Sequence, residues 1–155
     1  MGMIPFYTRF RDLAFQEMRS ATTQRWEDLP DGDYGFLEFY CDDSQCDCRR
    51  VLIQVIAQRK PTKVLATINY GWASEAFYYR RLGDAELAQA CTKPTLDPLN
   101  PQSKYAPALL RLFETVVQDK AYVQRLQRHY ALFKGQGKNV ARQDARTTSP
   151  RRRRK

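Results

Sequence analysis

The sequence predicts a single α+β domain in which a three-stranded antiparallel sheet packs against helices from both ends of the chain. Apolar residues make up 43% of the 155 residues and aromatic residues 12%, which favours a folded core over a disordered chain. Three segments rich in Val, Ile, Phe and Tyr follow one another closely in the first half of the chain. Segments with apolar residues at helical spacing lie before and after them.

The N-terminal segment predicts a helix over roughly residues 5–19. Phe6, Phe10 and Leu13 recur at the spacing of one helix face. Pro5 suits the first position of a helix, because the proline ring presets the required backbone angle. The turn-forming residues LPDGDYG then separate this helix from the strands.

The three strands are expected at residues 36–41, 49–58 and 63–72. The residues RKPT join the second strand to the third, and this link is short enough for a hairpin. The cysteine-containing stretch joins the first strand to the second. Because links this short connect antiparallel neighbours, we expect a meander.

Helices should dominate the rest of the chain. Ser74 can cap a helix that Gly83 ends. Residues 91–103 carry three prolines and should form an extended connector. An amphipathic helix is expected over 105–116, and a second one after Asp119.

The net charge of +9 is concentrated at the C-terminal end of the chain. Nine of the 26 basic residues and one of the 17 acidic residues lie from Lys134 onward, so this segment carries +8. Its composition turns to Gly, Gln, Thr, Ser and Arg, with no apolar face. We therefore expect a globular domain with a cysteine knuckle over residues 1–134 and a disordered basic tail over 135–155.

Three of the four cysteines are clustered between the first two predicted strands. Cys41, Cys46 and Cys48 have the spacing C-x4-C-x-C, so three thiolates could converge on one ion. Structural zinc prefers four tetrahedral nitrogen or sulfur ligands, which leaves one ligand to be found. Cys91 and His129, the only histidine, are the candidates, and water or a carboxylate is the remaining alternative. We favour His129, because its helical spacing from neighbouring apolar residues turns it inward.

Other interpretations of the cysteines stay open at this stage. They could be reduced structural cysteines, an iron–sulfur site or a catalytic cysteine, and Cys41 could form a disulfide with Cys46 or Cys48. The aspartates between the cysteines disfavour free thiolates by their negative charge. A bound cation reverses that penalty, and the prediction is a structural Zn²⁺.

The chain also resembles a widespread, uncharacterised bacterial protein family, some of whose relatives are described as metal-binding. The segments that carry the resemblance are GFLEFYCDDSQCDCRRVLIQV, KVLATINYGW, LDPLNPQSKYAPALL and LQRHYALF. It extends to about Gly135 and implies a metal site at Cys41, Cys46 and Cys48, with a weaker indication for His129. Cys91 and the basic tail lie outside the motif.

The sequence contains little of what an enzyme needs. It has no G-x-S-x-G, Walker or H-E-x-x-H motif, and any catalytic Cys–His pair or triad would have to use His129. We therefore expect a non-enzymatic binding module. A zinc-dependent hydrolase, with water in the fourth metal position, is the alternative enzyme.

The last five residues suggest a partner. Five consecutive cations bind polyanions by releasing counterions, and nucleic acid, RNA above all, is the commonest polyanion in a cytoplasm. The expected contact residues are Arg151, Arg152, Arg153, Arg154 and Lys155. A protein-binding adaptor with an incidental tail is the alternative. The N-terminus does not read as a secretory signal and no run of about 18 apolar residues occurs, so we expect a cytoplasmic protein without a membrane span.

Overall fold

The computed structural model describes residues 2–147, with side chains described as far as Gly135. Its helical segments are a 3-10 turn, η1 (Phe6–Thr8), and the α-helices α1 (Arg11–Glu17), α2 (Glu75–Leu82), α3 (Ala85–Cys91), α4 (Ala106–Val116) and α5 (Lys120–Thr147). Its strands are β1 (Met3–Pro5), β2 (Arg19–Thr23), β3 (Gly32–Cys41), β4 (Arg50–Ala57), β5 (Lys60–Gly71) and β6 (Thr95–Leu96). The α+β class is therefore confirmed.

The sheet has six strands, so the prediction of a three-stranded sheet was wrong. The three predicted strands form its centre as the antiparallel series β3–β4–β5. Both β1 and β2 pair with the same edge of β3, one beside its end and the other beside its beginning. β6 adds to the other edge, beside β5. These added strands are two to five residues long, too short for alternation of apolar residues to reveal them.

The N-terminal helix is also shorter than predicted. The segment that we expected to be one helix over residues 5–19 forms β1, η1, α1 and the start of β2. Phe6 is buried in η1, whereas Phe15 on α1 is 72% exposed. The apolar spacing therefore marked contacts with the body of the protein rather than one continuous helix.

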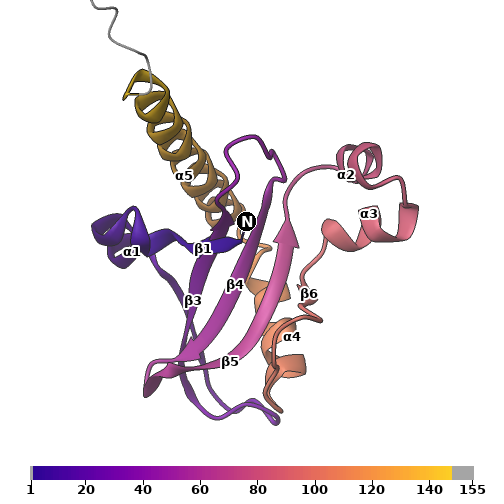
Figure 1. Cartoon of the computed structure of the whole chain (residues 1–155). Coiled ribbons are helices and arrows are strands. Elements are labelled where there is room, and N and C mark those ends of the chain that lie inside the picture. Colours follow the sequence, from indigo (N-terminus) through magenta and orange to yellow (C-terminus); the bar gives the residue numbers. More distant parts are fainter. Residues whose placement is uncertain (1, 148–155) are drawn as a thin grey trace, which may run out of the picture.

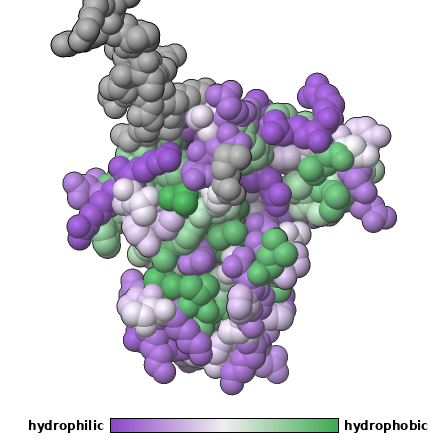
Figure 2. Space-filling view, viewed as in Figure 1, coloured by the Kyte–Doolittle hydropathy of each residue, from purple (hydrophilic) through white to green (hydrophobic). Residues whose placement is uncertain are grey.

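α4 and α5 cover one face of the sheet (Figure 1). Alternate side chains of β3 point toward these helices, because successive residues of a strand face opposite sides. Phe36 lies 5.4 Å from Phe113 of α4 between ring centroids, and Tyr40 lies 5.7 Å from Phe133 of α5. The residues between them, such as Leu37, lie on the opposite face and stay half-buried. Figure 2 shows hydrophobic patches over the sheet, bordered by hydrophilic residues.

The proline-rich connector protects an edge of the sheet. β6 pairs with only two residues of β5, and beyond them Gln102 takes the place of a strand. Its side-chain amide accepts a hydrogen bond from the Thr67 backbone N–H at 2.8 Å and donates one to the Thr67 carbonyl at 2.9 Å. An unpaired sheet edge can recruit other strands. The Gln102 contact pairs the backbone N–H and carbonyl of Thr67 and so blocks the addition of a strand at this point.

α2 and α3 form a helical pair beside the end of β5 (Figure 1). The predicted caps of α2 are confirmed: the Ser74 hydroxyl accepts a hydrogen bond from Phe77 N, and Gly83 adopts the left-handed conformation. A small second apolar cluster of Tyr78, Ala88 and Cys91 holds the pair together. It places α2 next to the loop that carries the clustered cysteines.

α5 is the longest element and runs from Lys120 to Thr147. Its start agrees with the predicted helix after Asp119, whose side chain accepts a hydrogen bond from Ala121 N. The predicted domain boundary at residue 134 falls inside the helix, because the backbone continues as α5 for thirteen more residues. Residues 148–155, the last eight residues of the predicted basic tail, lie outside the described part of the chain.

Candidate metal centre

The connection between β3 and β4 brings three thiols together. Cys41 ends β3, and Cys46 and Cys48 lie in the segment of residues 42–49, which we call the cysteine loop. The three Sγ atoms lie within 4.8 Å of one another, and all three residues are partly exposed. The arrangement can hold a metal ion, as the spacing of the cysteines predicted.

A local turn in the cysteine loop folds Cys46 back toward Cys41. The Asp43 side chain accepts a hydrogen bond from Gln45 N at 2.9 Å, and the Asp43 carbonyl accepts one from Cys46 N at 3.1 Å. Aspartate favours such turns because its short side chain reaches the backbone two residues on. Asp43 therefore shapes the loop and is not merely a solvated charge.

The end of the loop is held in an unusual backbone conformation. Arg49 has a φ of 48°, in the left-handed region that non-glycine residues rarely adopt. Its N–H donates to the Tyr130 hydroxyl at 3.2 Å, and its carbonyl accepts a hydrogen bond from the Tyr78 hydroxyl at 2.7 Å. Two phenol groups, one from α5 and one from α2, thus fix the residue that leads the chain into β4.

Further contacts tie the loop to distant parts of the chain. Tyr130 donates to Asp47 Oδ1 at 2.9 Å, and Lys134 Nζ donates to the Asp43 carbonyl at 2.9 Å. Near the N-terminus, Gly2 N donates to Asp42 Oδ1 at 3.1 Å. Each aspartate of the loop therefore has a hydrogen-bond partner, and α5 supplies two of the anchors.

The surroundings of Cys46 favour the protonated form of its thiol. Burial, and the nearby Cys48 and Cys41 sulfur atoms, raise the pKa of Cys46 to about 11. The guanidinium of Arg81 also lies near Cys46, with Nη2 3.8 Å from Cys46 Sγ. A bound cation would stabilise all three thiolates at once, because its positive charge offsets theirs.

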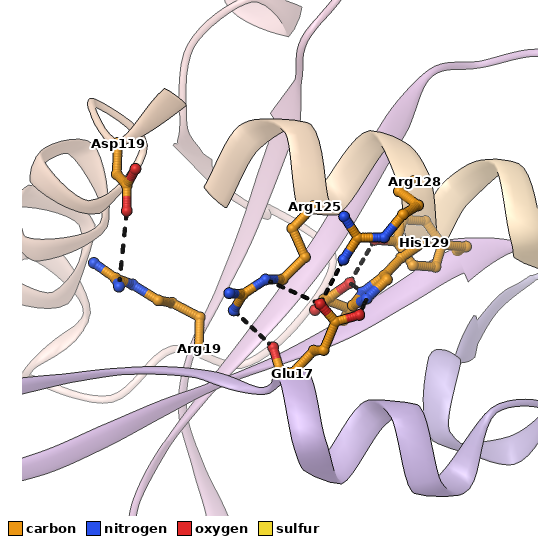
Figure 3. Close-up of polar contacts among 8 residues, drawn as sticks. Glu17, Arg19, Asp119, Arg125, Arg128 and His129 are labelled. Carbon is orange, nitrogen blue, oxygen red and sulfur yellow. Dashed lines mark hydrogen bonds and ion pairs between the residues drawn. The ribbon is translucent and has the colours of Figure 1, made fainter. Parts of the chain in front are cut away.

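The structure does not bring His129 to the three cysteines. Its ring is fully buried and stacks on Phe6 at 4.3 Å between centroids. Nδ1 lies 2.7 Å from Glu38 Oε1, and Nε2 lies 3.2 Å from Glu17 Oε1 (Figure 3). Both ring nitrogens therefore face carboxylates. The second candidate ligand, Cys91, is also elsewhere and packs against Tyr78.

The two carboxylates around His129 form a second polar cluster, which the sequence analysis missed. An imidazole that faces carboxylate oxygens with both nitrogens can donate to both only as the imidazolium. Glu38 is buried and also accepts a hydrogen bond from the Tyr40 hydroxyl at 2.6 Å. Burial, and then the Glu38 charge, raise the pKa of Tyr40, so it remains a donor.

Arginines of α5 complete this cluster at its exposed side. Arg128 binds the Glu17 carboxylate, and Arg125 Nη1 donates to the Glu17 carbonyl at 3.0 Å (Figure 3). The Arg128 hydrogen bond, opposed by burial and helped by His129, lowers the pKa of Glu17. The cluster thereby joins the end of α1 to β3 and α5.

Comparison with protein-family models, with curated proteins and with solved structures finds no match to this chain. The resemblance to an uncharacterised bacterial family therefore stays a prediction. Residues 151–155, the predicted nucleic-acid contacts, lie outside the described part of the chain. None of the helices described here combines the length and the apolar character needed to cross a membrane.

Replacing His129 by Ala tests the separation of the two polar clusters. The change removes a fully buried ring and a hydrogen-bond partner of the buried Glu38, so we expect the free energy of unfolding to fall by about 3–5 kcal/mol. The metal content of the folded protein should not change. Both quantities can be measured on the same sample, by chemical denaturation and by elemental analysis.

Arg128→Gln provides the matched control, because it removes only an exposed partner of Glu17. Its cost should be no more than about 1 kcal/mol. If His129→Ala folds but loses its metal, His129 is a ligand and the arrangement described above is wrong.

Proposed function

We propose that the protein is a small non-enzymatic binding module whose cysteine loop is stabilised by one zinc ion. The ligands would be Cys41, Cys46 and Cys48. The observation that carries the proposal is the approach of their Sγ atoms to within 4.8 Å of one another. In a tetrahedral site with Zn–S bonds of about 2.3 Å, sulfur atoms lie about 3.8 Å apart. Zinc therefore needs only a small inward movement of side chains on a loop already held by α2 and α5.

Zinc binding explains the three clustered thiols better than an iron–sulfur cluster or a catalytic cysteine does. Iron–sulfur clusters usually take four cysteine thiolates, and Cys91 packs elsewhere. A catalytic thiol would need a lowered pKa, whereas that of Cys46 is raised to about 11. Zinc needs no change of oxidation state and accepts three thiolates together with one other donor.

The surroundings of the thiols favour a structural role over hydrolysis. A zinc hydrolase needs an open metal position next to a group that can accept a proton. The three aspartates of the loop are bound by Gly2, by Gln45, and by Tyr130 together with Arg49. Since each carboxylate already serves to shape or anchor the loop, we assign the metal to stability.

Metal removal tests the proposal directly. The purified protein should contain one zinc ion per chain, and chelation should lower its melting temperature. At free zinc about 1,000-fold above the dissociation constant, the bound ion would contribute about 4 kcal/mol to the free energy of unfolding. Calorimetry before and after chelation measures the difference, and elemental analysis gives the stoichiometry.

Single serine substitutions identify the ligands. Exchange of Cys41, Cys46 or Cys48 should abolish stoichiometric zinc binding. Cys91→Ser is the matched control: it buries a hydroxyl and costs some stability, but the zinc should remain. A protein that never carries metal and is equally stable with and without chelator would contradict the proposal.

A second proposal concerns the C-terminal residues and rests on charge. Residues 134–155 carry +8 of the net charge of +9, so the rest of the chain is nearly neutral. We propose that Arg151, Arg152, Arg153, Arg154 and Lys155 contact nucleic acid, with RNA as the first candidate. Phosphate contacts do not distinguish bases, so binding should depend little on sequence.

Removal of residues 148–155 tests this proposal without shortening α5. The deletion removes five cations, and each phosphate contact contributes about 0.9 to the slope of log affinity against log salt. Since a chain end does not engage every charge at once, we expect the slope to flatten by about three units. Salt titrations of RNA and DNA binding measure it.

The matched control replaces Lys60 and Lys63, two exposed cations of the folded body, by Gln. This change should leave the salt slope almost unaltered. Equal affinity and equal slope for the full and shortened chains would remove the nucleic-acid proposal and leave a protein-binding adaptor.

A further inference from the structure

The three-thiolate centre leaves one metal coordination position that no side chain described in the structure fills. The sequence has four cysteines and one histidine. Cys91 and His129 lie in other clusters, and in the described part of the chain no carboxylate joins the three Sγ atoms within 4.8 Å. Zinc in such a site takes a fourth ligand, which then comes from outside these side chains.

The rim of the site beside Cys46 is positively charged. Arg81 of α2 places Nη2 3.8 Å from Cys46 Sγ, and its guanidinium lies 5.5 Å from the centre of the Phe77 ring. Arg49, which also lies over Phe77, is bound to Asp47 by an ion pair. Arg81 forms no ion pair with a carboxylate among the described residues. It is therefore the cation that can receive an anionic ligand.

Charge and donor type together define the ligand that would fit. Three thiolates and Zn²⁺ carry a net charge of −1, and a fourth thiolate would complete the all-sulfur set that structural zinc accepts. The added negative charge needs a cation nearby, which Arg81 supplies. A guanidinium also binds a carboxylate through two parallel hydrogen bonds.

From this arrangement we propose that the centre binds a small thiol that carries a carboxylate. The inference rests on the proposed zinc site. Cys41, Cys46 and Cys48 would hold the metal, and the bound thiol would give its proton to the solvent and supply the fourth thiolate. Its carboxylate binds Arg81. The protein would thus present a metal centre that recognises low-molecular-weight thiols with a carboxylate.

The test uses the full chain loaded with Co²⁺ under anaerobic conditions, because cobalt reports its ligands in the visible spectrum. Titration with N-acetylcysteine should raise the sulfur-to-cobalt charge-transfer band by about one-third, as a fourth thiolate joins three. The change should saturate, and one Co²⁺ per chain should remain at the end. 2-Mercaptoethanol, a thiol without a carboxylate, should bind about tenfold more weakly.

Arg81→Gln should remove the preference for N-acetylcysteine over 2-mercaptoethanol. Arg80→Gln, one residue earlier on the exposed side of α2, is the matched control and should keep the preference. If Co²⁺ binds but the charge-transfer band does not change with either thiol, the open position does not exist and the inference is wrong. If both thiols bind equally well and Arg81→Gln changes nothing, recognition of the carboxylate is wrong. If no metal binds at all, the proposed zinc site fails first.

Discussion

Three thiol groups lie within 4.8 Å of one another in the cysteine loop, and a cation between them would favour their binding as thiolates. The raised pKa of Cys46, about 11, reflects burial together with the nearby sulfur atoms. The protein nevertheless holds the three sulfur atoms together. The loop ends at Arg49, whose backbone has the left-handed conformation. The hydroxyl groups of Tyr78 and Tyr130 form hydrogen bonds with its carbonyl and its N–H. A strained backbone kept in place by buried phenol groups is a feature of functional sites, and here it serves to converge the thiols.

α5 connects this loop to the second polar cluster. Neighbouring residues of the helix serve the two sites: His129 faces Glu38 and Glu17, whereas Tyr130 binds Asp47 and the backbone of Arg49. One turn further on, Lys134 binds the carbonyl of the loop residue Asp43. α5 therefore fixes the end of α1, the centre of β3 and the cysteine loop relative to one another. Loss of the proposed metal should loosen the loop and α2 before it disturbs the carboxylates around His129.

Much of this arrangement could be predicted from the sequence, for physical reasons that differ between elements. β4 and β5 are long and rich in branched residues, and α2 carries its own caps, so local preference agrees with the final structure. β1 and β6 exist only through pairing with strands distant in the sequence, and β2 is a short strand held by pairing with the neighbouring β3. No local pattern reveals these three strands. The N-terminal segment followed a helical period, but its apolar residues contact different elements.

The candidate site was predictable in its thiols and not in its surroundings. The spacing of Cys41, Cys46 and Cys48 in a short connection was enough to expect convergence. His129 was correctly expected to face inward, but its partner is a carboxylate. The available signal was Glu38, which lies between Phe36 and Tyr40 on the buried side of β3 and so had to find a buried hydrogen-bond partner. The roles of Tyr78, Tyr130 and Arg81 depend on tertiary contacts alone.

The central claim is that one metal ion is held by three thiolates of the cysteine loop and not by the histidine. X-ray absorption spectroscopy at the zinc edge of the loaded protein, in thiol-free buffer, tests it most directly. The account predicts three sulfur atoms at about 2.3 Å and one lighter atom, without the scattering pattern of an imidazole ring. Two or fewer sulfur ligands, or a clear imidazole contribution, would contradict it.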